Sequence, residues 1–333
     1  MTANERWTRR PEGSTWGDWG ADDQVGRLNL ITPEMRLAAV AEVREGRAFL
    51  LSLPLDLPGD EGPDAYRQAP RLFVRNWGDE PLYNMRVGSA VTSDDHVVLS
   101  LQYSTQWDAL AHCGAMFDVD GSGTPVPVYY NGWRAHEHIV GPQGDAPPCA
   151  HKLGIENMAL TGVQGRGVLI DLARQFGTEF RLVGYDDLMR TLDAQGQEVR
   201  TGDFLCFYTG YGDALLAMGR QPDHAALHRT GCALDGHDAR LLQWIEDSGA
   251  VSLIADNPAV EFVDQSVDYR THDILPLHIH CIFKLGMHLG ELFWLGDLAR
   301  HLRATERTAF LFTGPPLRLP GACGSPAAPV ATV

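Results

Sequence analysis

Short apolar segments alternate with helical segments along the second half of this 333-residue chain, and this alternation restricts the fold more than any other feature. Residues 167–170 have the character of a short buried strand, 185–194 carry leucines at helical spacing, and 203–208 return to strand character. A helix that begins at Asp235 is then followed by the apolar run 251–255. This order of strand, helix and strand predicts an α/β fold.

The chain is long enough to bury a large core, because 44% of its residues are hydrophobic. We expect a single domain over residues 1–333, with an N-terminal arm, 1–31, and a C-terminal tail, 314–333. Segments 54–70 and 114–150 are rich in Gly, Pro and Asp. They are therefore expected to form long loops that cover a site.

The formal net charge of −16 disfavours nucleic acids and anionic membranes as partners, because both attract basic surfaces. A small molecule is the expected partner. The first residues contain no apolar segment of a signal peptide, and no later stretch approaches the roughly 18 apolar residues of a membrane helix. A cytoplasmic location is expected.

Residues 102–112 gather polar groups directly after an expected strand, 97–101. Alternation beyond that strand would place Gln102, Gln106 and Asp108 on one face. In α/β proteins the ligand crevice lies at such strand ends. The segment therefore predicts a functional site.

The competing interpretation of Asp108 and His112 is a buried network of hydrogen bonds with no ligand. It is less favoured, because charged groups are seldom buried without a partner or a metal ion.

The same segment resembles the His-x-Gly-Thr-His-x-Asp-x-Pro-x-His signature of the Putative cyclase family, which includes bacterial kynurenine formamidases and isatin hydrolases. Thr105, Asp108 and His112 are in register with it, whereas Gln102 and Gln106 stand where the signature has histidines. Ser104 replaces its glycine and Leu110 its proline. Further segments similar to the longer branch of the family follow in order along the chain: 16–23, 26–32, 165–171, 207–211, 256–261, 278–291 and 324–326.

The resemblance implies a three-layer β/β/α domain of the swivelling type that associates as a homodimer or homotetramer and holds a divalent ion, Zn²⁺ or Mn²⁺. It implies that Asp108 and Glu291 bind this metal and that His112 performs general acid/base catalysis. The later histidine of the site is His278 or His280, and the spacing to Glu291 favours His278.

Gln106 occupies the position of a metal ligand. An amide oxygen is a neutral hard donor, so the replacement of histidine shifts the metal preference away from histidine-rich zinc coordination.

These roles predict metal-assisted hydrolysis of the carbonyl group of a small amide, formamide, lactone or lactam. Gln102, Trp107 and Tyr211 are expected to contact the substrate, with Trp294 as a further aromatic wall. The alternative is that the aromatic side chains belong to the core. Two other functions stay open: a lyase or ring-closing enzyme that uses the same metal on a polyketide-like ketone, and a metal-free binding protein of the same fold.

Other candidate sites are less favoured. The thiol of Cys113 lies beside His112 in the sequence but has no obvious activating base, and the six cysteines form no C-x-x-C pair. His224 and His228 have helical i, i+4 spacing, but Ala225 stands where a metalloprotease motif has glutamate.

Trp7, Trp16 and Trp19 give the N-terminal segment more apolar surface than a free terminus should expose. This observation predicts a homo-oligomer. The alternative is that the segment folds back on its own domain.

Overall fold

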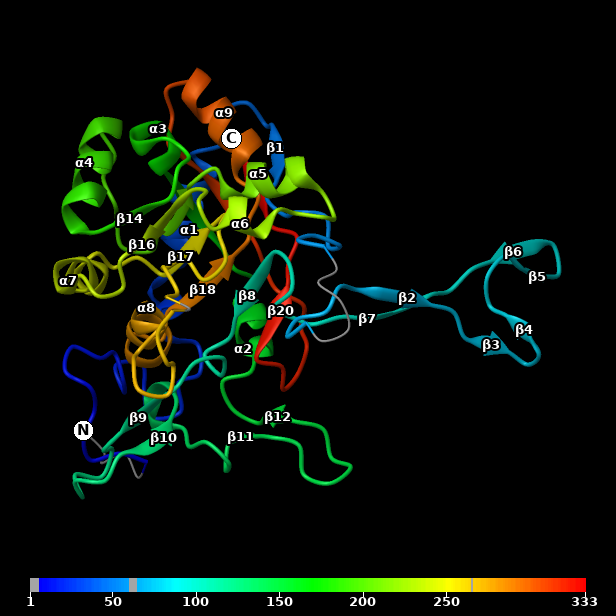
Figure 1. The fold of residues 1–333 in the computed structure, drawn as a ribbon, viewed down its shortest axis with the longest axis horizontal. Helices are drawn as coiled ribbons and strands as arrows, with labels where there is room; N and C mark the ends of the chain where they lie inside the picture. Colours follow the sequence, from blue (N-terminus) through cyan, green and yellow to red (C-terminus); the bar gives the residue numbers. More distant parts are fainter. Residues whose placement is uncertain (1–5, 60–64, 265) are drawn as a thin grey trace.

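The main sheet of the computed structural model, which describes residues 6–59, 65–264 and 266–333, has nine strands and lies at the centre of the molecule (Figure 1). In sheet order these are β1 (Ala48–Leu50), β21 (Val330–Thr332), β19 (Ala309–Thr313), β13 (Gln164–Asp171), β15 (Phe204–Tyr208), β17 (Ser252–Ala255), β18 (His288–Glu291), β8 (Gln106–Asp108) and β20 (Gly324–Pro326). Residues 1–5 of the expected N-terminal arm and 60–64 of an expected loop lie outside the described residues.

The sheet is parallel in the middle and antiparallel on both sides. β13, β15, β17 and β18 are parallel neighbours. β19 joins β13 in antiparallel orientation, and β8 joins β18 in the same way. The predicted fold class is confirmed at the level of a mixed α/β protein.

Helices connect and cover the strands. They are α1 (Pro33–Val40), α2 (Ile155–Leu160), α3 (Leu172–Phe176), α4 (Tyr185–Gln195), α5 (Tyr211–Met218), α6 (His224–Leu227), α7 (Ala239–Asp247), α8 (Pro276–His278) and α9 (Gly296–Ala304). α8 continues as one π-helical segment, η3 (Ile279–Lys284), and short 3₁₀ helices form at η1 (Gly26–Leu30) and η2 (Tyr130–Gly132). 

Capping residues account for several helix ends. Thr32 caps α1, with Pro33 at its first position, and its hydroxyl oxygen accepts a hydrogen bond from the Met35 amide at 3.2 Å. The predicted helix after Asp235 begins four residues later, at Ala239, because the carboxylate of Asp238 accepts the first free amides of α7. Asp235 instead accepts the amide of His237 in the preceding turn.

Both faces of the sheet are buried. Successive side chains of β15 enter two different cores: Leu205 and Phe207 pack in one, whereas Phe204 and Cys206 pack in the other. α4 and α7 contribute leucines to the first core, and α9 contributes to the second. The strands therefore carry apolar residues at almost every position, as buried parallel strands do.

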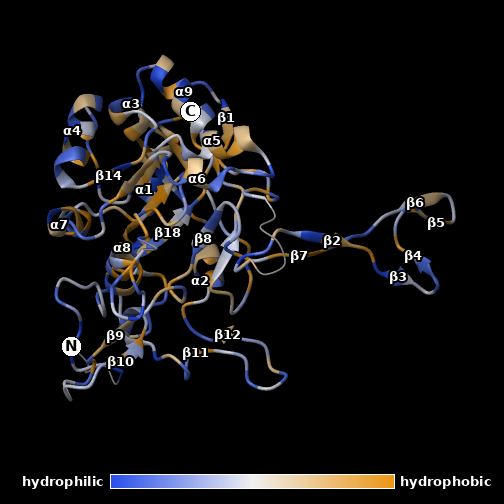
Figure 2. Ribbon diagram, viewed as in Figure 1, coloured by the Kyte–Doolittle hydropathy of each residue, from blue (hydrophilic) through white to orange (hydrophobic). Residues whose placement is uncertain are grey.

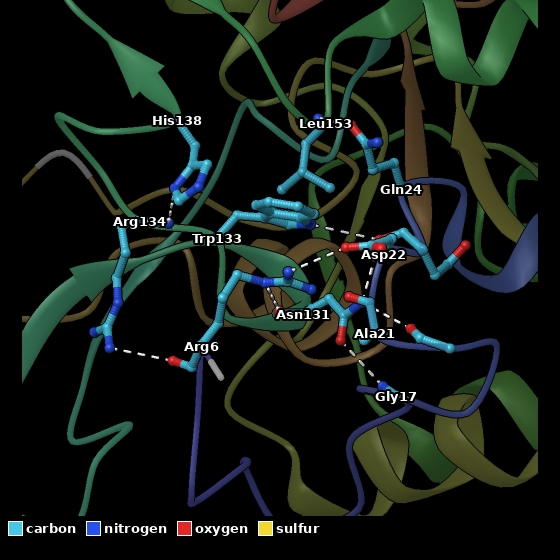
Figure 3. Close-up of polar contacts among 12 residues, drawn as sticks. Arg6, Gly17, Ala21, Asp22, Gln24, Asn131, Trp133, Arg134, His138 and Leu153 are labelled. Carbon is cyan, nitrogen blue, oxygen red and sulfur yellow. Dashed lines mark hydrogen bonds and ion pairs between the residues drawn. The ribbon is translucent and has the colours of Figure 1, made fainter. Parts of the chain in front are cut away.

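The N-terminal segment folds back on its own domain. Trp16 is fully buried, and its indole nitrogen donates to the carbonyl oxygen of Phe283 at 2.8 Å. The amide group of Asn131 donates to three carbonyls of the segment, including those of Gly20 and Ala21, and its oxygen accepts the Gly17 amide (Figure 3). The tryptophan-rich opening is thus accounted for within one chain, so it no longer argues for an oligomer.

Residues 71–98 form an arm that projects far from the body, and we call it the β-arm (Figure 1). Its stalk consists of β2 (Arg71–Phe73) paired with β7 (His96–Val98). Two small ribbons make up its far end: β3 (Asn76–Trp77) with β4 (Glu80–Pro81), and β5 (Met85–Val87) with β6 (Ala90–Thr92). The expected strand over 97–101 is confirmed only at Val97 and Val98, which belong to the exposed stalk, and residues 99–101 are not in a strand.

The expected loop over 114–150 contains two small antiparallel ribbons, β9 (Ala115–Phe117) with β10 (Val126–Val128) and β11 (Ile139–Val140) with β12 (Cys149–Ala150). The expected C-terminal tail supplies β20 and β21 to the main sheet. A further parallel pair, β14 (Arg181–Val183) and β16 (Cys232–Leu234), lies outside the main sheet. None of the described helices is long and apolar enough to cross a bilayer.

Candidate metal centre

Two neighbouring strands, β8 and β18, bring the first polar side chains together. Gln106 lies directly opposite Glu291 in the antiparallel register, and the Gln106 amide nitrogen donates to a Glu291 carboxylate oxygen at 2.7 Å. Because side chains alternate along a strand, Asp108 lies on the same face as Gln106, and Trp107 lies on the other. Gln106, Asp108 and Glu291 are all buried.

His278, at the end of α8, is held in place by a carboxylate. Its ring nitrogen Nδ1 lies 2.7 Å from Glu261 Oε1, and the backbone amides of Leu277 and His278 each donate to Glu261 at 2.9 Å. The other ring nitrogen, Nε2, lies 3.3 Å from Glu291 and 3.7 Å from Asp108. A histidine oriented by a carboxylate at one nitrogen, with the other nitrogen facing a site, is the usual arrangement of a metal-binding imidazole.

His112 completes the cluster from the turn that follows β8. Its Nε2 lies 3.8 Å from Asp108 Oδ1, and its side chain is 25% exposed. Asp108, His112 and His278 each offer one ligand atom, and these atoms lie within 4.8 Å of one another. The exposure of His112 places it between the buried carboxylates and solvent.

The side chain of Asp108 fits a bound cation. It is fully buried, and neither carboxylate oxygen takes part in a hydrogen bond with any described residue. The amide oxygen of Gln106 is likewise buried without a hydrogen bond in the described part of the chain. A buried carboxylate without hydrogen bonds is unfavourable unless a cation compensates it. This observation argues against a self-contained polar network and for a metal ion as the missing partner.

The pKa shifts in the cluster arise from burial and from the interactions of the clustered groups with one another. Burial raises the pKa of Asp108 to about 6, despite the opposing attraction of His112. Burial would lower the pKa of His278, but its hydrogen bonds to Glu261 and Glu291 raise this pKa to about 10. The described chain thus places three carboxylates around one imidazole, and this excess of negative charge favours a divalent ion.

The donor set is rich in oxygen. Asp108 and Glu291 offer carboxylate oxygens, Gln106 offers an amide oxygen, and His278 offers one nitrogen. A carboxylate can only accept hydrogen bonds, so the amide nitrogen of Gln106 must face Glu291 and the amide oxygen stays available. Such a set suits harder ions than a site built mainly from histidines does.

A cavity of about 410 Å³ reaches the cluster at His112, His278 and Glu291. Its further lining is mainly apolar, with a few polar groups among Tyr66, Arg67, Phe180, Tyr211, Leu227, His228, Thr230, Cys232, Ala233, Asn257, Pro258, Ala259, Glu261, Phe262, Val263 and Leu275. Apolar walls with a few polar groups are typical of small-molecule sites. Tyr211, one of the expected substrate contacts, lies in this wall.

Two expected substrate contacts lie elsewhere. Trp107 is fully buried in the core on the opposite face of the sheet, where its indole nitrogen donates to the Gly314 carbonyl at 2.7 Å. Gln102 is half-buried beside Gly324 and does not line the cavity. Trp294 donates to Asp213 at 2.9 Å and is also outside the lining. For Trp107 and Trp294, packing within the fold explains the position.

The structure separates the two candidate histidines of the later segment. His278 faces the carboxylates, whereas His280 packs elsewhere, and burial lowers the pKa of His280 to about 4. Cys113 is not suited to act as a nucleophile, because burial raises the pKa of its thiol to about 12. His228 lies at the cavity, while His224 is not part of its lining.

Sequence reasoning missed Glu261 as a site residue. This residue follows β17 by six positions and orients His278. Glu261 is a polar residue that follows a buried strand. The same kind of signal, polar residues after an expected strand, predicted the site at residues 102–112. Arg67 was also missed, because nothing in its loop sequence predicts that it lines the cavity.

The fold and the site together define a mixed α/β protein with a buried Asp/His cluster at the end of a cavity, one that could hold a metal ion. The model of the Putative cyclase family matches residues 50–262. One solved structure, described as the crystal structure of a novel cyclase, is 30% identical over 100% of both chains, with a TM-score of 0.77. The protein therefore belongs to the Putative cyclase family, as its sequence predicted.

More distant structures share the fold. Isatin hydrolase A from Labrenzia aggregata, bound to benzyl benzoate, is 13% identical, with 86% of this chain and 93% of that chain covered and a TM-score of 0.56. An isatin hydrolase bound to the product analogue thioisatinate is 12% identical, with coverages of 91% and 99% and a TM-score of 0.55. No curated protein sequence matches the chain.

Proposed function

We propose that the protein is a metal-dependent hydrolase that breaks the acyl C–N or C–O bond of a small amide, formamide, lactone or lactam. The observation that carries the proposal is the buried Asp108 carboxylate, which has no hydrogen bond from the described residues and faces His112 and His278 at a cavity. Membership of the cyclase family and the shared fold with isatin hydrolases support it.

Asp108, Glu291 and His278 would hold the ion, with the amide oxygen of Gln106 as a further donor. A bound divalent cation supplies a Lewis acid that polarises a carbonyl and makes water more acidic. Glu261 holds the His278 ring so that its Nε2 faces the site. The oxygen-rich donor set favours Mn²⁺, and Zn²⁺ is the alternative.

His112 is the proposed proton carrier. It lies next to Asp108 at the boundary between the buried carboxylates and the cavity, so a substrate in the cavity comes within its reach. In its neutral form it can accept a proton from water and then deliver it to the leaving group.

The cavity supports a compact substrate. Its volume of about 410 Å³ and its walls from Phe180, Tyr211 and Phe262 suit a small ring. Isatin hydrolases are named for a cyclic amide, and this is consistent with a lactam in the proposed substrate class.

Two further properties stay predictions of the family resemblance. They are the three-layer β/β/α arrangement of the swivelling type and the homodimer or homotetramer.

The test is hydrolysis with isotopic water. Protein loaded with Mn²⁺ or Zn²⁺ is incubated in H₂¹⁸O with a panel of aryl formamides, lactams and lactones. The masses of the products are then measured by mass spectrometry. We expect one solvent oxygen in the acid that hydrolysis releases, which is the ring-opened product of a lactam or lactone and the formate of a formamide, and loss of turnover in the presence of a chelator. Turnover without solvent oxygen in any product would indicate lyase chemistry, and turnover that persists in metal-free protein would contradict the metal role.

A further inference from the structure

The guanidinium of Arg67 lies at the cavity wall without a partner among the described residues. Arg67 is partly buried, and its guanidinium forms no hydrogen bond or ion pair with any of them. The other described arginines without such a partner, among them Arg44, Arg71 and Arg318, are exposed to water. A partly buried cation without a partner is unfavourable, because it loses hydration and gains no interaction in exchange. A ligand in the cavity is therefore expected to supply the partner.

The neighbours of Arg67 hold its backbone in place but leave its hydrogen-bond donors available. The amide of the next residue, Gln68, donates to the hydroxyl oxygen of Ser100 at 2.9 Å. The centre of the Tyr66 ring lies 6.0 Å from the guanidinium carbon, at the outer limit of a cation–π contact. A guanidinium carries five N–H donors in a fixed fork, and a ring contact occupies none of them.

The charges of the site leave Arg67 as the cation that an anionic ligand would meet. Asp108 and Glu291 together balance a divalent ion, and Glu261 already accepts hydrogen bonds from two backbone amides and from the His278 ring. Burial is the largest influence on the pKa of Asp108 and of Glu291, and the attraction of Arg67 opposes it in both. Arg67 therefore lies within electrostatic reach of the cluster. A bound ion would satisfy these two carboxylates, and the guanidinium would then pair with a ligand.

The rest of the wall favours a carboxylate as this ligand. Most of the lining is apolar, and Tyr211 enters it from α5, a mainly hydrophobic helix (Figure 2). A charge pair in such surroundings is less weakened than in water. The planar guanidinium fork matches a carboxylate with two parallel hydrogen bonds. A phosphate group would bring roughly two negative charges towards the carboxylates of the site, so a carboxylate, with one charge, meets less repulsion.

We propose that Arg67 binds a carboxylate of the substrate and so determines specificity for an anionic compound. The inference rests on the proposed function and narrows it: the substrate is an amide, formamide, lactone or lactam that carries a carboxylate apart from the bond that is broken. The scissile carbonyl lies at the candidate metal centre, and the carboxylate lies at Arg67. Binding of the carboxylate does not require turnover, so the two proposals can be tested separately.

The test compares probes that differ in one charge. They are 2-, 3- and 4-formamidobenzoate, each paired with the neutral formamidobenzamide of the same shape. Metal-loaded protein is used, with dissociation constants from calorimetry for compounds that are not turned over and kcat/KM for compounds that are. In at least one pair we expect wild type to favour the carboxylate by roughly 10–100-fold, the usual contribution of a charge-assisted hydrogen-bonded pair.

Arg67→Met should abolish this preference, while the constant for the neutral probe and the metal content stay close to those of wild type. Arg67→Lys keeps the charge without the fork, so it should retain only part of the preference. The matched control is Arg71→Met, which removes the same charge four residues further along the chain. Arg71 is exposed and does not line this cavity, so the control should keep the wild-type preference.

Three outcomes would overturn the proposal. The first is a wild type that shows no preference in any of the three pairs. The second is a preference that survives in Arg67→Met, because the carboxylate is then held by the metal ion alone. The third is an equal weakening of both probes of a pair in Arg67→Met, which would make Arg67 part of the cavity structure. Absence of turnover together with a carboxylate preference that depends on Arg67 would contradict the proposed hydrolysis and support the carboxylate site.

Discussion

The candidate metal centre depends on Asp108 more than on any other residue. Three features meet at this carboxylate: full burial, no hydrogen bond from the described residues, and two imidazoles within 4 Å. No other described cluster of His, Cys, Asp and Glu side chains gathers three possible ligand atoms so closely. The roles of Asp108 and His112 can therefore be separated by mutation.

Asp108→Asn should reduce metal content and turnover together, because the change removes the negative charge that faces the ion. His112→Ala should leave metal content close to that of wild type and lower turnover by roughly 10²–10⁴-fold, the usual contribution of general acid/base catalysis. Metal content is measured by plasma emission spectrometry on protein purified without chelator, and turnover on the same samples. Loss of metal in both variants would make His112 a ligand instead of a proton carrier.

Much of this site could be predicted at the level of residues, and the exceptions have physical reasons. Gln106, Asp108 and His112 lie within one short segment, so local spacing was sufficient to group them. The spacing to Glu291 favoured His278 over His280, and the helix explains why only one of them can face the site, since two residues of helix turn a side chain away by about 200°. Trp107 lies between Gln106 and Asp108 in its strand, so its side chain is on the opposite face, in the core. Its nearness to these residues in the sequence does not show this.

At the scale of elements, helical spacing was a reliable guide in the sequence. The helix expected over 185–194 is confirmed as α4, whose C-cap Gly196 lies in the left-handed region with φ 59°. Asp235 was mistaken for Asp238 because two aspartates three residues apart are both suitable caps. The β-arm could not be predicted, because its strands of two or three residues are too short for a periodic pattern.

Asp238 links α7 to α4, and its replacement tests this cap. The carboxylate accepts the amides of Arg240 and Leu241 in α7 and that of Tyr185 in α4. Asp238→Ala should lower the free energy of unfolding by about 1 kcal/mol at pH 7. Urea unfolding followed by circular dichroism measures the change.

The effect of Asp238 should also depend on pH. The hydrogen bond from the Tyr185 amide is the main reason that the pKa of Asp238 lies below its usual value. A lowered pKa in the folded state stabilises the fold above the usual pKa, and this stabilisation is lost as the pH falls through the lowered value. The gap between wild type and Asp238→Ala should therefore narrow in acid. Asp238→Asn keeps a capping oxygen without the charge. The difference in unfolding free energy between Asp238→Asn and Asp238→Ala should therefore not narrow in acid.

At the scale of the whole molecule, the candidate site joins segments that are distant in the sequence. Asp108, Glu261, His278 and Glu291 come from β8, the segment after β17, α8 and β18. A ligand that binds this assembled site but not the unfolded chain must stabilise the entire fold. Binding of a metal ion at the candidate site would thus be thermodynamically coupled to folding of the main sheet.

Saturating Mn²⁺ or Zn²⁺ should raise the melting temperature of chelator-treated protein. An ion at about 100 times its dissociation constant adds roughly 2.7 kcal/mol. For a chain of this size that corresponds to roughly 4 °C. Differential scanning fluorimetry measures the shift, and Ca²⁺ at the same concentration serves as a control for ionic strength. An equal shift in the Asp108→Asn variant would show that the ion acts at another site.

The position of β8 in the sheet has a consequence for biosynthesis. β8 lies between β18 and β20, so residues 106–108 find both of their strand partners at 288–291 and 324–326. During translation the acidic strand must therefore wait for nearly two hundred further residues before its first partner strand exists. Until that moment β8 has no strand to pair with, so the candidate metal centre is one of the last parts of the molecule that can form during synthesis.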